Sequence, residues 1–489
     1  MGLDKEFLLR SLLQHNYFPS QKRNKEEFPP ILNSKSLTPE ISKELIKLFY
    51  RKDGYDQVEY RVTRYNNVPR LFSIPHPLPY VKLCHSLYDN WEKLKYITKT
   101  EISLIIPKKH NDGRIIIMDY EKSKNKIESH IKHSFNKKFY TKTDISNFYP
   151  SIYSHSIPWA LVGFEEAKKD RDPKKWFNQI DKYQRLLKRN ETNGVPIGPA
   201  TSNIISELVL ARIDKILKEE GFEFVRYIDD YTGYFDTYEK AEEFIRRLSE
   251  ELSKYKLLLN VKKTIIGQLP IPSSDEWIVD LTTRLPDKKH ITHTNMIRFL
   301  DYALTKQGIN PDGSILKYAV KSIIYDVKGD TVELLLQYLL GLCIKYPILI
   351  PLLDILFKKI KFNSGFPYTD QLLKILNEHT INKRSDAMAW TLYYLNKYYQ
   401  PIPEGIAKEI LNSKDCIPIL FLYLTNQHNK KVINFCNSLN KSDPFLLDQH
   451  WLLLYQLFFD EEISNPYKDD EDKGKSFEIL KNEGVSFIG

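Results

Sequence analysis

Residues 222–235 read FEFVRYIDDYTGYF, and the interpretation of the remaining sequence depends on this stretch. Aromatic and β-branched residues on both sides of Asp229 and Asp230 predict two strands joined by a tight turn that carries both carboxylates. Adjacent aspartates are also common as ordinary turn or cap residues, so the pair alone is a weak functional signal. Its meaning depends on the segments that come before and after it.

The first of these segments is FYTKTDI, which predicts a strand that ends at Asp144. A carboxylate that leaves a strand end and a carboxylate at a neighbouring hairpin turn can converge. Such a pair holds two Mg²⁺ ions about 3.5–4 Å apart, and oxygen ligands are those that Mg²⁺ prefers. We therefore predict that Asp144 and Asp229 are metal ligands, with Ile145 contributing its backbone carbonyl as a further ligand.

Two more segments complete the pattern. Residues 194–203 read GVPIGPATSN, a glycine and proline loop that opens onto a long helix and lets its backbone approach a flat ligand closely. An ordinary strand-to-helix connector is the alternative interpretation. Further along, LLLNVKKT places Lys263 after an amphipathic helix and a short strand, where a solvated lysine at a strand end is the alternative.

This ordered set resembles the palm of reverse transcriptases. The matching motifs are DISNFY at residues 144–149, GVPIGP at 194–199, YIDD at 227–230 and LNVKKT at 259–264, within a region of about residues 100–265. The sequences of residues 144–161 and 194–214 are similar to those of the bacterial defence branch, the phage abortive-infection reverse transcriptases. The resemblance implies fingers and palm followed by a helical-repeat domain.

The resemblance also implies roles for individual residues. Asp144, Asp229 and Asp230 would be catalytic, and Lys263 would neutralise the pyrophosphate leaving group or donate a proton to it. Tyr149 stands at the position of the steric gate, where an aromatic ring excludes a ribose 2′-hydroxyl; core packing is the alternative for Tyr149 and its neighbour. The substrates would be deoxynucleoside triphosphates, with Mg²⁺ as the cofactor.

Further residues are expected to bind the nucleotide. Arg114, with Lys108 or Lys109, lies in a predicted hairpin around HNDG, where basic residues clamp a triphosphate; ordinary surface charges are the alternative. Ile197 and Gly198, in the glycine and proline loop, complete the nucleotide-binding prediction.

Two features depart from templated enzymes of the family. Ile197 stands where those enzymes typically have Gln, so the polar side chain that helps to hold the incoming nucleotide is missing. After Lys263 the chain continues into QLPIPSSDEW, and no thumb or primer-grip segment is recognisable. Both departures favour what the resemblance implies, DNA synthesis without a template that begins on a protein hydroxyl.

The priming hydroxyl cannot be chosen from 31 tyrosines by sequence. Tyr17, in NYFPSQ, is one candidate, with packing against the first helix as its alternative. Tyrosines in the helical region are expected to pack in the core or on its inner face; they are Tyr393, Tyr394, Tyr398 and Tyr399.

Composition sets the outer limits. The chain has 489 residues, and its 42% hydrophobic content excludes a largely disordered chain. Its net charge of +9 permits a polyanionic partner. The four cysteines lie far apart without a CxxC pair, which argues against a zinc site or disulfide framework and fits a reducing cytoplasm. The most apolar stretch, residues 334–357, contains Lys345, Asp354 and two prolines, so we predict core helices and no membrane span.

The predicted fold class is α+β, with reverse-transcriptase-like fingers and palm followed by an all-α domain of HEAT-like helical repeats. We predict an N-terminal helical and finger segment at residues 1–100, fingers and palm at 101–275, the helical-repeat domain at 276–464, and a charged, solvated tail at 465–489. Within the palm, alternating strands and helices favour a mostly antiparallel sheet.

The predicted function is Mg²⁺-dependent DNA polymerisation, untemplated and protein-primed, in phage abortive infection. Its product would be single-stranded DNA, covalently attached to the protein, and the family resemblance implies a homo-oligomer in the cytoplasm. One alternative is a templated enzyme that copies a specific RNA. The other is an inactive palm that serves, with the helical repeats, as a binding scaffold for nucleic acid or a phage protein.

Overall fold

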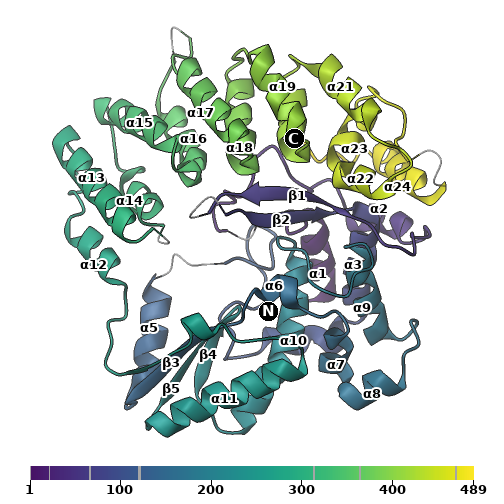
Figure 1. The fold of residues 1–489 in the computed structure, drawn as a ribbon, viewed down its shortest axis with the longest axis vertical. Helices are drawn as coiled ribbons and strands as arrows, with labels where there is room; N and C mark the ends of the chain where they lie inside the picture. The colour runs from purple at the N-terminus through teal and green to yellow at the C-terminus, as the bar shows by residue number, and fades with distance from the viewer. Residues whose placement is uncertain are drawn as a thin grey trace.

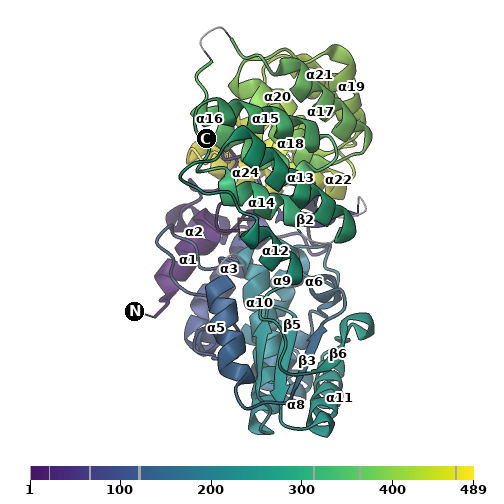
Figure 2. The ribbon, with the colours of Figure 1, turned by 90° about the vertical axis from the view of Figure 1, so that its left-hand side faces the viewer.

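The computed structural model describes residues 2–20, 22–64, 68–118, 123–311, 314–362, 365–467 and 471–489. A four-stranded sheet with its helices forms the lower part of Figure 1, and the helices that follow it form an arch over a separate two-stranded hairpin. In the side view the same elements form a lower lobe and an upper lobe that meet at the hairpin (Figure 2).

The four-stranded sheet has the order β4-β5-β3-β6, and all its strand pairs are antiparallel. Its strands are β3 (Phe139–Asp144), β4 (Phe224–Tyr227), β5 (Asp230–Phe235) and β6 (Ile265–Gln268). The mixed helix and sheet architecture and the antiparallel sheet that the sequence predicts are confirmed.

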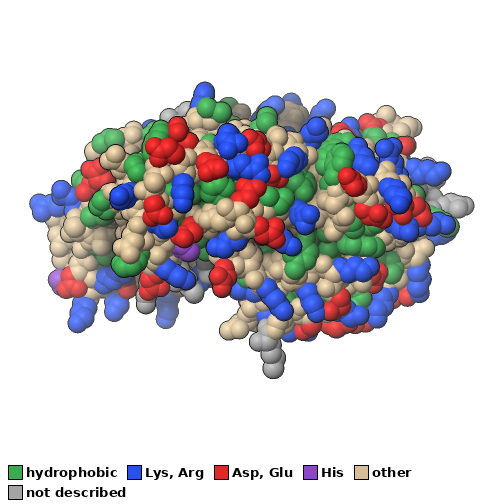
Figure 3. All heavy atoms as spheres, turned by 90° about the horizontal axis from the view of Figure 1, so that it is seen from below, with side chains coloured by type: hydrophobic (Ala, Val, Ile, Leu, Met, Phe, Trp, Pro, Cys, Tyr) green, Lys and Arg blue, Asp and Glu red, His purple; other side chains and the backbone are tan. Residues whose placement is uncertain are grey.

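Two long helices support this sheet. The helix α11 (Tyr238–Lys254) packs against β3 and β5 and against α10 (Ala200–Glu219). Its Phe244 is fully buried, and the ring lies 5.3–5.5 Å from the rings of Phe222, Phe224 and Phe235. The opposite side of α11 is polar, and on the lower face of the molecule basic and acidic side chains are interspersed (Figure 3).

The other helices of this region are shorter. The segment SIPWALVGFEEAKKD forms two helices, because Gly163 between them has a φ of +89°. The bounds are α5 (Ser123–Ser134), α6 (Phe148–Ser151), α7 (Ser156–Val162), α8 (Phe164–Lys169), α9 (Trp176–Leu186) and the 3₁₀ turn η3 (Val261–Lys263).

The N-terminal region contains helices and the β1–β2 hairpin. Thr38 caps α2, with Pro39 at its first position. The bounds are α1 (Lys5–Gln14), α2 (Pro39–Leu45), β1 (Gln57–Val62), β2 (Arg70–Pro75), α3 (Pro77–Asp89), α4 (Trp91–Leu94) and η2 (Lys95–Thr98). Residues 102–106 and 114–118, which flank the predicted HNDG hairpin turn, contain only isolated bridges, Ser103 to Arg226 and Lys22 to Met118.

From residue 276 onward, the described residues form helices and turns, and Figure 1 shows them arching from the sheet over the hairpin to the N-terminal helices. In that part of the chain none of the helices combines the length and apolar character needed to cross a membrane. The bounds are α12 (Glu276–Thr283), α13 (His293–Ile309), α14 (Ile315–Ile323), α15 (Asp330–Cys343), η4 (Pro347–Leu352), α16 (Leu353–Lys359), α17 (Thr369–Ile381), α18 (Ser385–Lys397), α19 (Glu404–Asn412), α20 (Cys416–Leu424), α21 (Asn429–Ser438), α22 (Pro444–Gln449), α23 (Trp451–Phe459) and α24 (Glu471–Asn482).

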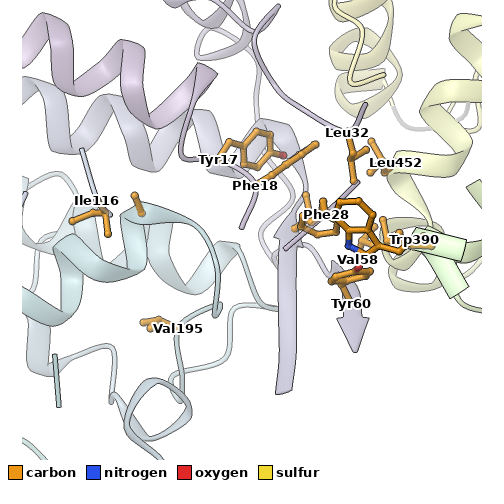
Figure 4. Close-up of a cluster of buried hydrophobic side chains, with 14 of the residues drawn as sticks. Tyr17, Phe18, Phe28, Leu32, Val58, Tyr60, Ile116, Val195, Trp390 and Leu452 are labelled. Carbon is orange, nitrogen blue, oxygen red and sulfur yellow. The ribbon is translucent and has the colours of Figure 1, made fainter. Parts of the chain in front are cut away.

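The helical arch shares its core with the N-terminal region. In Figure 4, Trp390 and Leu452 of the arch lie beside Tyr60, Phe28 and Leu32. These side chains are at most 7% exposed. The two regions that the sequence assigns to separate domains are therefore joined through one hydrophobic core.

Polar contacts join the same regions. Asp386 of α18 accepts hydrogen bonds of 2.9 Å from the N–H and the hydroxyl of Thr63, beside the end of β1. Asp448 of α22 pairs with Arg51 and accepts a 2.9 Å hydrogen bond from the N–H of Asp56. The hairpin is thus held by carboxylates of two different helices of the arch.

The C-terminal segment corrects the expectation of a solvated tail. Residues 471–482 form α24, which packs against α2, and Phe477 and Leu480 are fully buried. Beyond it, Phe487 is also buried, and its carbonyl accepts a 3.0 Å hydrogen bond from the N–H of Asn33. Charged residues dominate this segment's composition, but its few apolar side chains are spaced to cover the N-terminal core. Part of the predicted tail, residues 468–470, lies outside the described residues.

Candidate active site

The strand register brings the three predicted carboxylates together. Asp144, the last residue of β3, lies opposite Asp230, the first residue of β5. Asp229 is in the turn between β4 and β5, and its carbonyl accepts a 3.2 Å hydrogen bond from the N–H of Ile145. Because paired strands fix which residues stand side by side, the segments meet at one edge of the sheet although they are distant in sequence.

The electrostatics of this edge are those of crowded carboxylates. The pKa of Asp229 is raised to about 6, mainly by burial and also by the negative charges of Asp230 and Asp144, while Arg70 acts in the opposite direction. Asp144 is 8% exposed, and its Oδ1 is buried with no hydrogen-bond partner in the described part of the chain. Each of these features is costly unless a cation lies between the carboxylates.

Lys263 supplies one positive charge at this edge. Its Nζ lies 2.6 Å from Asp144 Oδ2, and this hydrogen bond raises the pKa of Lys263. The turn η3 is anchored to the strand end, because the N–H of Asn260 donates to the Asp144 carbonyl at 2.8 Å. The lysine side chain itself is 66% exposed, so it can leave the carboxylate without disturbing the core.

A metal ion is compatible with these residues. Among the described residues, no three His, Cys, Asp or Glu side chains form a ready-made metal cluster. The buried Oδ1 of Asp144 nevertheless lacks a donor, and hard carboxylate oxygens are the donor type that Mg²⁺ takes. The N–H of Ile145 donates to the Asp229 carbonyl. The Ile145 carbonyl, which is the predicted metal ligand, takes no part in that hydrogen bond.

Tyr149 lies against the glycine and proline loop. The N–H of Val195 donates to the Tyr149 carbonyl at 3.0 Å, and the amide of Asn203 donates to the Tyr149 hydroxyl at 2.9 Å. Phe148 is buried while Tyr149 is half-buried, so core packing applies to Phe148. Asn203 belongs to α10 and was not singled out from the sequence.

The loop is also fixed on its other side. The Ile197 carbonyl accepts a 2.8 Å hydrogen bond from the N–H of Ser73 in β2, which ties the loop to the hairpin. Gly198 has a φ of +134°, and a Cβ there would lie 2.5 Å from Pro19. Close packing against Pro19 is therefore one physical reason for glycine at this position.

Residues 75–304 match the family model for reverse transcriptase (RNA-dependent DNA polymerase). The chain contains a reverse transcriptase domain. The matched residues begin at the end of β2 and end within α13, so they include the three carboxylates, Lys263 and the glycine and proline loop. A search of the curated proteins gave no match.

Solved telomerase structures are distantly similar. Apo telomerase from Candida tropicalis, truncated from its C-terminal domain, is 13% identical with a TM-score of 0.30; the match covers 48% of this chain and 56% of that one. The structure titled apo telomerase from the same organism is 10% identical over 81% of this chain and 73% of that one, TM-score 0.33. Telomerase from Candida albicans with a TWJ fragment of telomeric RNA is 12% identical over 80% and 68%, TM-score 0.28. This chain spans just over half of the first of these structures, and likeness at this level carries no functional conclusion.

Within the reverse transcriptase domain, Arg114 differs from the prediction. Its side chain is 1% exposed, and its guanidinium donates to the carbonyls of Lys22 and Arg23 at 2.6 and 3.0 Å and to Asp112 at 2.8 Å. These bonds tie the guanidinium to the backbone of Lys22 and Arg23, so a triphosphate clamp is not its role in this structure. The HNDG turn itself is present, with a 3.1 Å hydrogen bond from the Gly113 N–H to the His110 carbonyl.

The two lysines of this loop have different surroundings. Lys109 pairs with Asp4 and lies over the ring of Phe7, while Lys108 is exposed. Of the basic residues predicted to bind a triphosphate, Lys108 is thus the one that the described contacts leave accessible.

The tyrosines divide clearly. Tyr17 is fully buried and donates to the Pro75 carbonyl at 2.5 Å, and its ring stacks on Tyr80 at 4.0 Å. It packs in the core, and the folded chain does not present its hydroxyl. Of the four arch tyrosines, Tyr399 departs from the expected packing, since it is 92% exposed. The others are at least partly buried: Tyr393, Tyr394 and Tyr398.

Sequence reasoning missed two arginines near the carboxylates. Arg70, the first residue of β2, is exposed, and its charge lowers the pKa of Asp229. Arg226, in β4, is fully buried directly before the YIDD turn. The signal for Arg70 was an arginine in RYNNVPR, which reads as an ordinary loop. The signal for Arg226 was a charge inside an otherwise apolar strand, which requires a buried partner.

Proposed function

We propose that this chain is a Mg²⁺-dependent nucleotidyltransferase that adds deoxynucleotides to a hydroxyl group without a template. The supporting observation is the register that sets Asp144 opposite Asp230 with Asp229 in the adjoining turn, together with the unsatisfied Oδ1 of Asp144. Three crowded carboxylates are costly for a scaffold and useful for a cation. The matched reverse transcriptase domain supports the same class of chemistry.

Each residue has a proposed role in this reaction. Asp144 and Asp229, with the Ile145 carbonyl, would hold Mg²⁺, which when bound neutralises phosphate charge and activates the attacking hydroxyl. Asp230 is the third catalytic carboxylate. Lys263 leaves Asp144 to neutralise or protonate the pyrophosphate, and Tyr149 excludes the ribose 2′-hydroxyl.

The nucleotide itself would contact the loop and two basic residues. The loop that carries Ile197 and Gly198 contacts Tyr149 through the N–H of Val195, and the base and sugar would rest against this loop. Arg70 replaces Arg114 in the proposal as a triphosphate ligand, because it is exposed and its charge reaches Asp229. Lys108 stays in the proposal as an accessible basic residue.

The finer parts of the proposal rest on the sequence resemblance. They are protein priming with covalently attached single-stranded DNA, a role in phage abortive infection, HEAT-like repeats in the arch, a homo-oligomer and a cytoplasmic location. Ile197 in place of Gln supports untemplated synthesis. The name of the matched family, RNA-dependent DNA polymerase, favours the templated alternative.

One incubation separates these functions. The purified chain is incubated with deoxynucleotides and Mg²⁺, with and without nuclease pretreatment and added RNA template, and the product is sequenced. Untemplated synthesis predicts incorporation that survives nuclease pretreatment and a product unrelated to any added RNA. A product complementary to RNA would establish the templated alternative. If no product forms under any condition, the inactive palm that serves as a binding scaffold is the remaining hypothesis. Intact-mass analysis of the protein detects covalently attached DNA.

Metal binding should depend on pH through Asp229. Its carboxyl has a pKa raised to about 6, so below that pH it is protonated and cannot ligate a cation. We expect Mn²⁺ affinity, measured by electron paramagnetic resonance, to rise up to about tenfold per pH unit between pH 5 and 6 and to level off above pH 7. The control variant, Asp229→Asn, should show a weaker affinity without this step. A flat profile in the unmodified chain would remove Asp229 from the ligand set.

Replacing Lys263 by Met should slow nucleotide transfer. A proton donor or counter-charge at the leaving group contributes about 10²-fold or more to such a rate, so we expect kcat to fall by that factor. Mn²⁺ binding should not weaken, because the ammonium that occupies Asp144 Oδ2 is gone. Lys262→Met, an exposed neighbour in η3, is the matched control. Equal rates for the two variants would refute the role of Lys263.

Replacing Tyr149 by Ala should relax discrimination against ribonucleotides. We expect the preference for deoxynucleotides to fall about 10- to 200-fold, the range that pocket sterics supply. Asn203→Ala should change it in the same direction by less, because the ring stays but its hydroxyl loses the 2.9 Å hydrogen bond. The comparison is with Tyr149→Phe, which keeps the ring. The measurement is the ratio of kcat/KM values for matched nucleotides, and an unchanged ratio in Tyr149→Ala would exclude the gate.

A further inference from the structure

Arg226 forms a buried charge cluster with α10. Its side chain is fully buried, and both Nε and Nη2 donate to Asp214 Oδ2, at 2.9 and 2.7 Å. Its Nη1 and Nη2 donate to the two carboxylate oxygens of Glu207, at 2.9 and 3.0 Å. Glu207 and Asp214 lie on one face of α10, seven residues apart, so the helix offers the guanidinium two fixed carboxylates.

One nitrogen of Arg226 also makes a hydrogen bond outside the cluster. Arg226 Nη1 also donates to the carbonyl of Ile228 at 2.7 Å, and Ile228 has a φ of +59°. A β-branched side chain is strained at positive φ, at a cost of about 1–3 kcal/mol, and keeps this conformation only where its surroundings impose it. The strained peptide directly precedes Asp229. The orientation of that carboxylate therefore depends on a conformation that the Arg226 hydrogen bond restrains.

Other contacts hold the two strands that flank the turn. The N–H of Arg226 donates to the Ile102 carbonyl, and its own carbonyl accepts from the N–H of Leu104, both at 2.8 Å. On the other side, the Tyr231 hydroxyl donates to Asp214 Oδ1 at 2.9 Å. With both strand ends fixed, the Ile228 peptide is the element of the turn whose geometry the guanidinium sets.

Stability alone does not account for such a cluster. Buried ion pairs lose much of their Coulombic energy to desolvation, and apolar replacements are often as stable. Geometric restraint at a functional turn is a use that apolar residues cannot serve. Groups that orient metal ligands from behind typically change metal affinity or activity about 10- to 100-fold when they are removed.

We infer that Arg226 is a positioning residue, which holds the Ile228 peptide in its left-handed conformation and thereby aims Asp229 at the metal site. The inference rests on the proposed function for the role of Asp229. The same helix also carries Asn203, four residues before Glu207. The Asn203 side chain contacts Tyr149. One face of α10 thus sets the carboxylate turn and the tyrosine in a fixed relation.

The test removes the hydrogen bond while sparing the fold. In the triple variant Arg226→Met, Glu207→Gln, Asp214→Asn, no unpaired charge stays buried. We expect Mn²⁺ affinity, measured by electron paramagnetic resonance, and kcat to fall about 10- to 100-fold, with little change in the KM for nucleotide. The matched control is Arg247→Met on α11, which removes ion pairs to Glu220 and Glu250 far from the turn and should change neither quantity.

A fourth substitution makes the test specific. Ile228→Gly, added to the triple variant, removes the strain at positive φ, so the turn no longer needs the restraint and Mn²⁺ affinity should recover. A purely structural role for the cluster predicts no such recovery. Unchanged Mn²⁺ affinity in the folded triple variant, or no recovery with glycine, would overturn the inference.

Two further outcomes are covered. If the triple variant does not fold, Arg226→Lys keeps the charge but not the planar fork, and it should show the same loss of Mn²⁺ affinity while circular dichroism shows an intact fold. If it binds Mn²⁺ like the unmodified chain, the inference fails. If the unmodified chain binds Mn²⁺ through Asp229 but incorporates no nucleotide, the proposed function fails and the Mn²⁺ measurements still decide the role of Arg226.

Discussion

Asp229→Asn combined with Asp230→Asn should abolish nucleotide incorporation and leave the chain folded. Both substitutions keep the side-chain volume and remove the charges that would hold the cation and the transferred phosphate. Losing such electrostatic stabilisation costs about 10³-fold or more in rate, which places the variant below detection in an ordinary extension assay. The measurement is incorporation of labelled deoxynucleotide per molecule of protein at saturating Mg²⁺.

The fold should tolerate this change because the carboxylates oppose folding at neutral pH. The pKa of Asp229 is raised from 3.8 to about 6 in the folded chain, mainly by burial. A carboxyl that binds its proton more tightly when folded lowers stability as pH rises through that interval, and the penalty is complete above pH 6. Removing it should raise the free energy of unfolding at pH 7 by about 1–3 kcal/mol.

A matched control separates loss of chemistry from loss of charge. Glu242→Gln with Glu243→Gln also removes two adjacent acidic residues, on the exposed side of α11. This control should polymerise like the unmodified chain. If the Asp229 and Asp230 variant extends DNA, the assignment of the metal site is wrong. If it loses activity only together with its fold, the assignment stays undecided by activity and rests on Mn²⁺ binding by Asp229→Asn alone.

The site residues could be predicted where a short sequence motif contains the residues that carry the chemistry. Asp144, Asp229 and Lys263 each follow a strand or turn signal, and strand pairing then leaves few ways for the segments to meet. Their grouping at one sheet edge was therefore accessible from motif order. The pKa of Asp229 was not, because it depends on burial that only the packed structure defines.

Arg114 shows the limit of motif reasoning. A basic residue after a glycine turn has the same appearance whether its guanidinium faces solvent or binds backbone carbonyls. Here it binds the carbonyls of Lys22 and Arg23, more than 90 positions earlier in the chain. No local signal specifies that contact. Arg226 is the converse case, since a charged residue within an apolar strand could have been recognised as a buried partner of α10 before the structure was seen.

The shared core across the predicted domain boundaries could not be predicted from the sequence, for a related reason. Composition changes near residue 276 because the fold class changes there, from sheet to helices. Composition carries no information about which apolar faces meet across that boundary. The β1–β2 hairpin lies under α18, α20, α22 and α23, and its core is completed by residues almost 400 positions away.

Trp451→Ala should destabilise the whole chain and not only the helical arch. Trp451 is fully buried; its Nε1 donates to the Ile74 carbonyl at 3.0 Å, and its ring is parallel to that of Tyr17 at 6.5 Å. Truncating a buried Trp costs about 3–5 kcal/mol, a large share of the stability of an ordinary protein. The measurement is urea unfolding followed by circular dichroism.

The number of unfolding transitions shows whether the arch unfolds together with the rest of the chain. Because Trp451 links β2 to the arch, we expect the transition to stay single and to move to lower urea as a whole. Trp277→Ala in α12 is the matched control: Trp277 is half-buried, its ring contacts Tyr318 at 5.5 Å, and its loss should cost much less. Two separate transitions in Trp451→Ala, with the later one at the midpoint of the unmodified chain, would show that the arch unfolds on its own and that the shared core does not couple it to the reverse transcriptase domain.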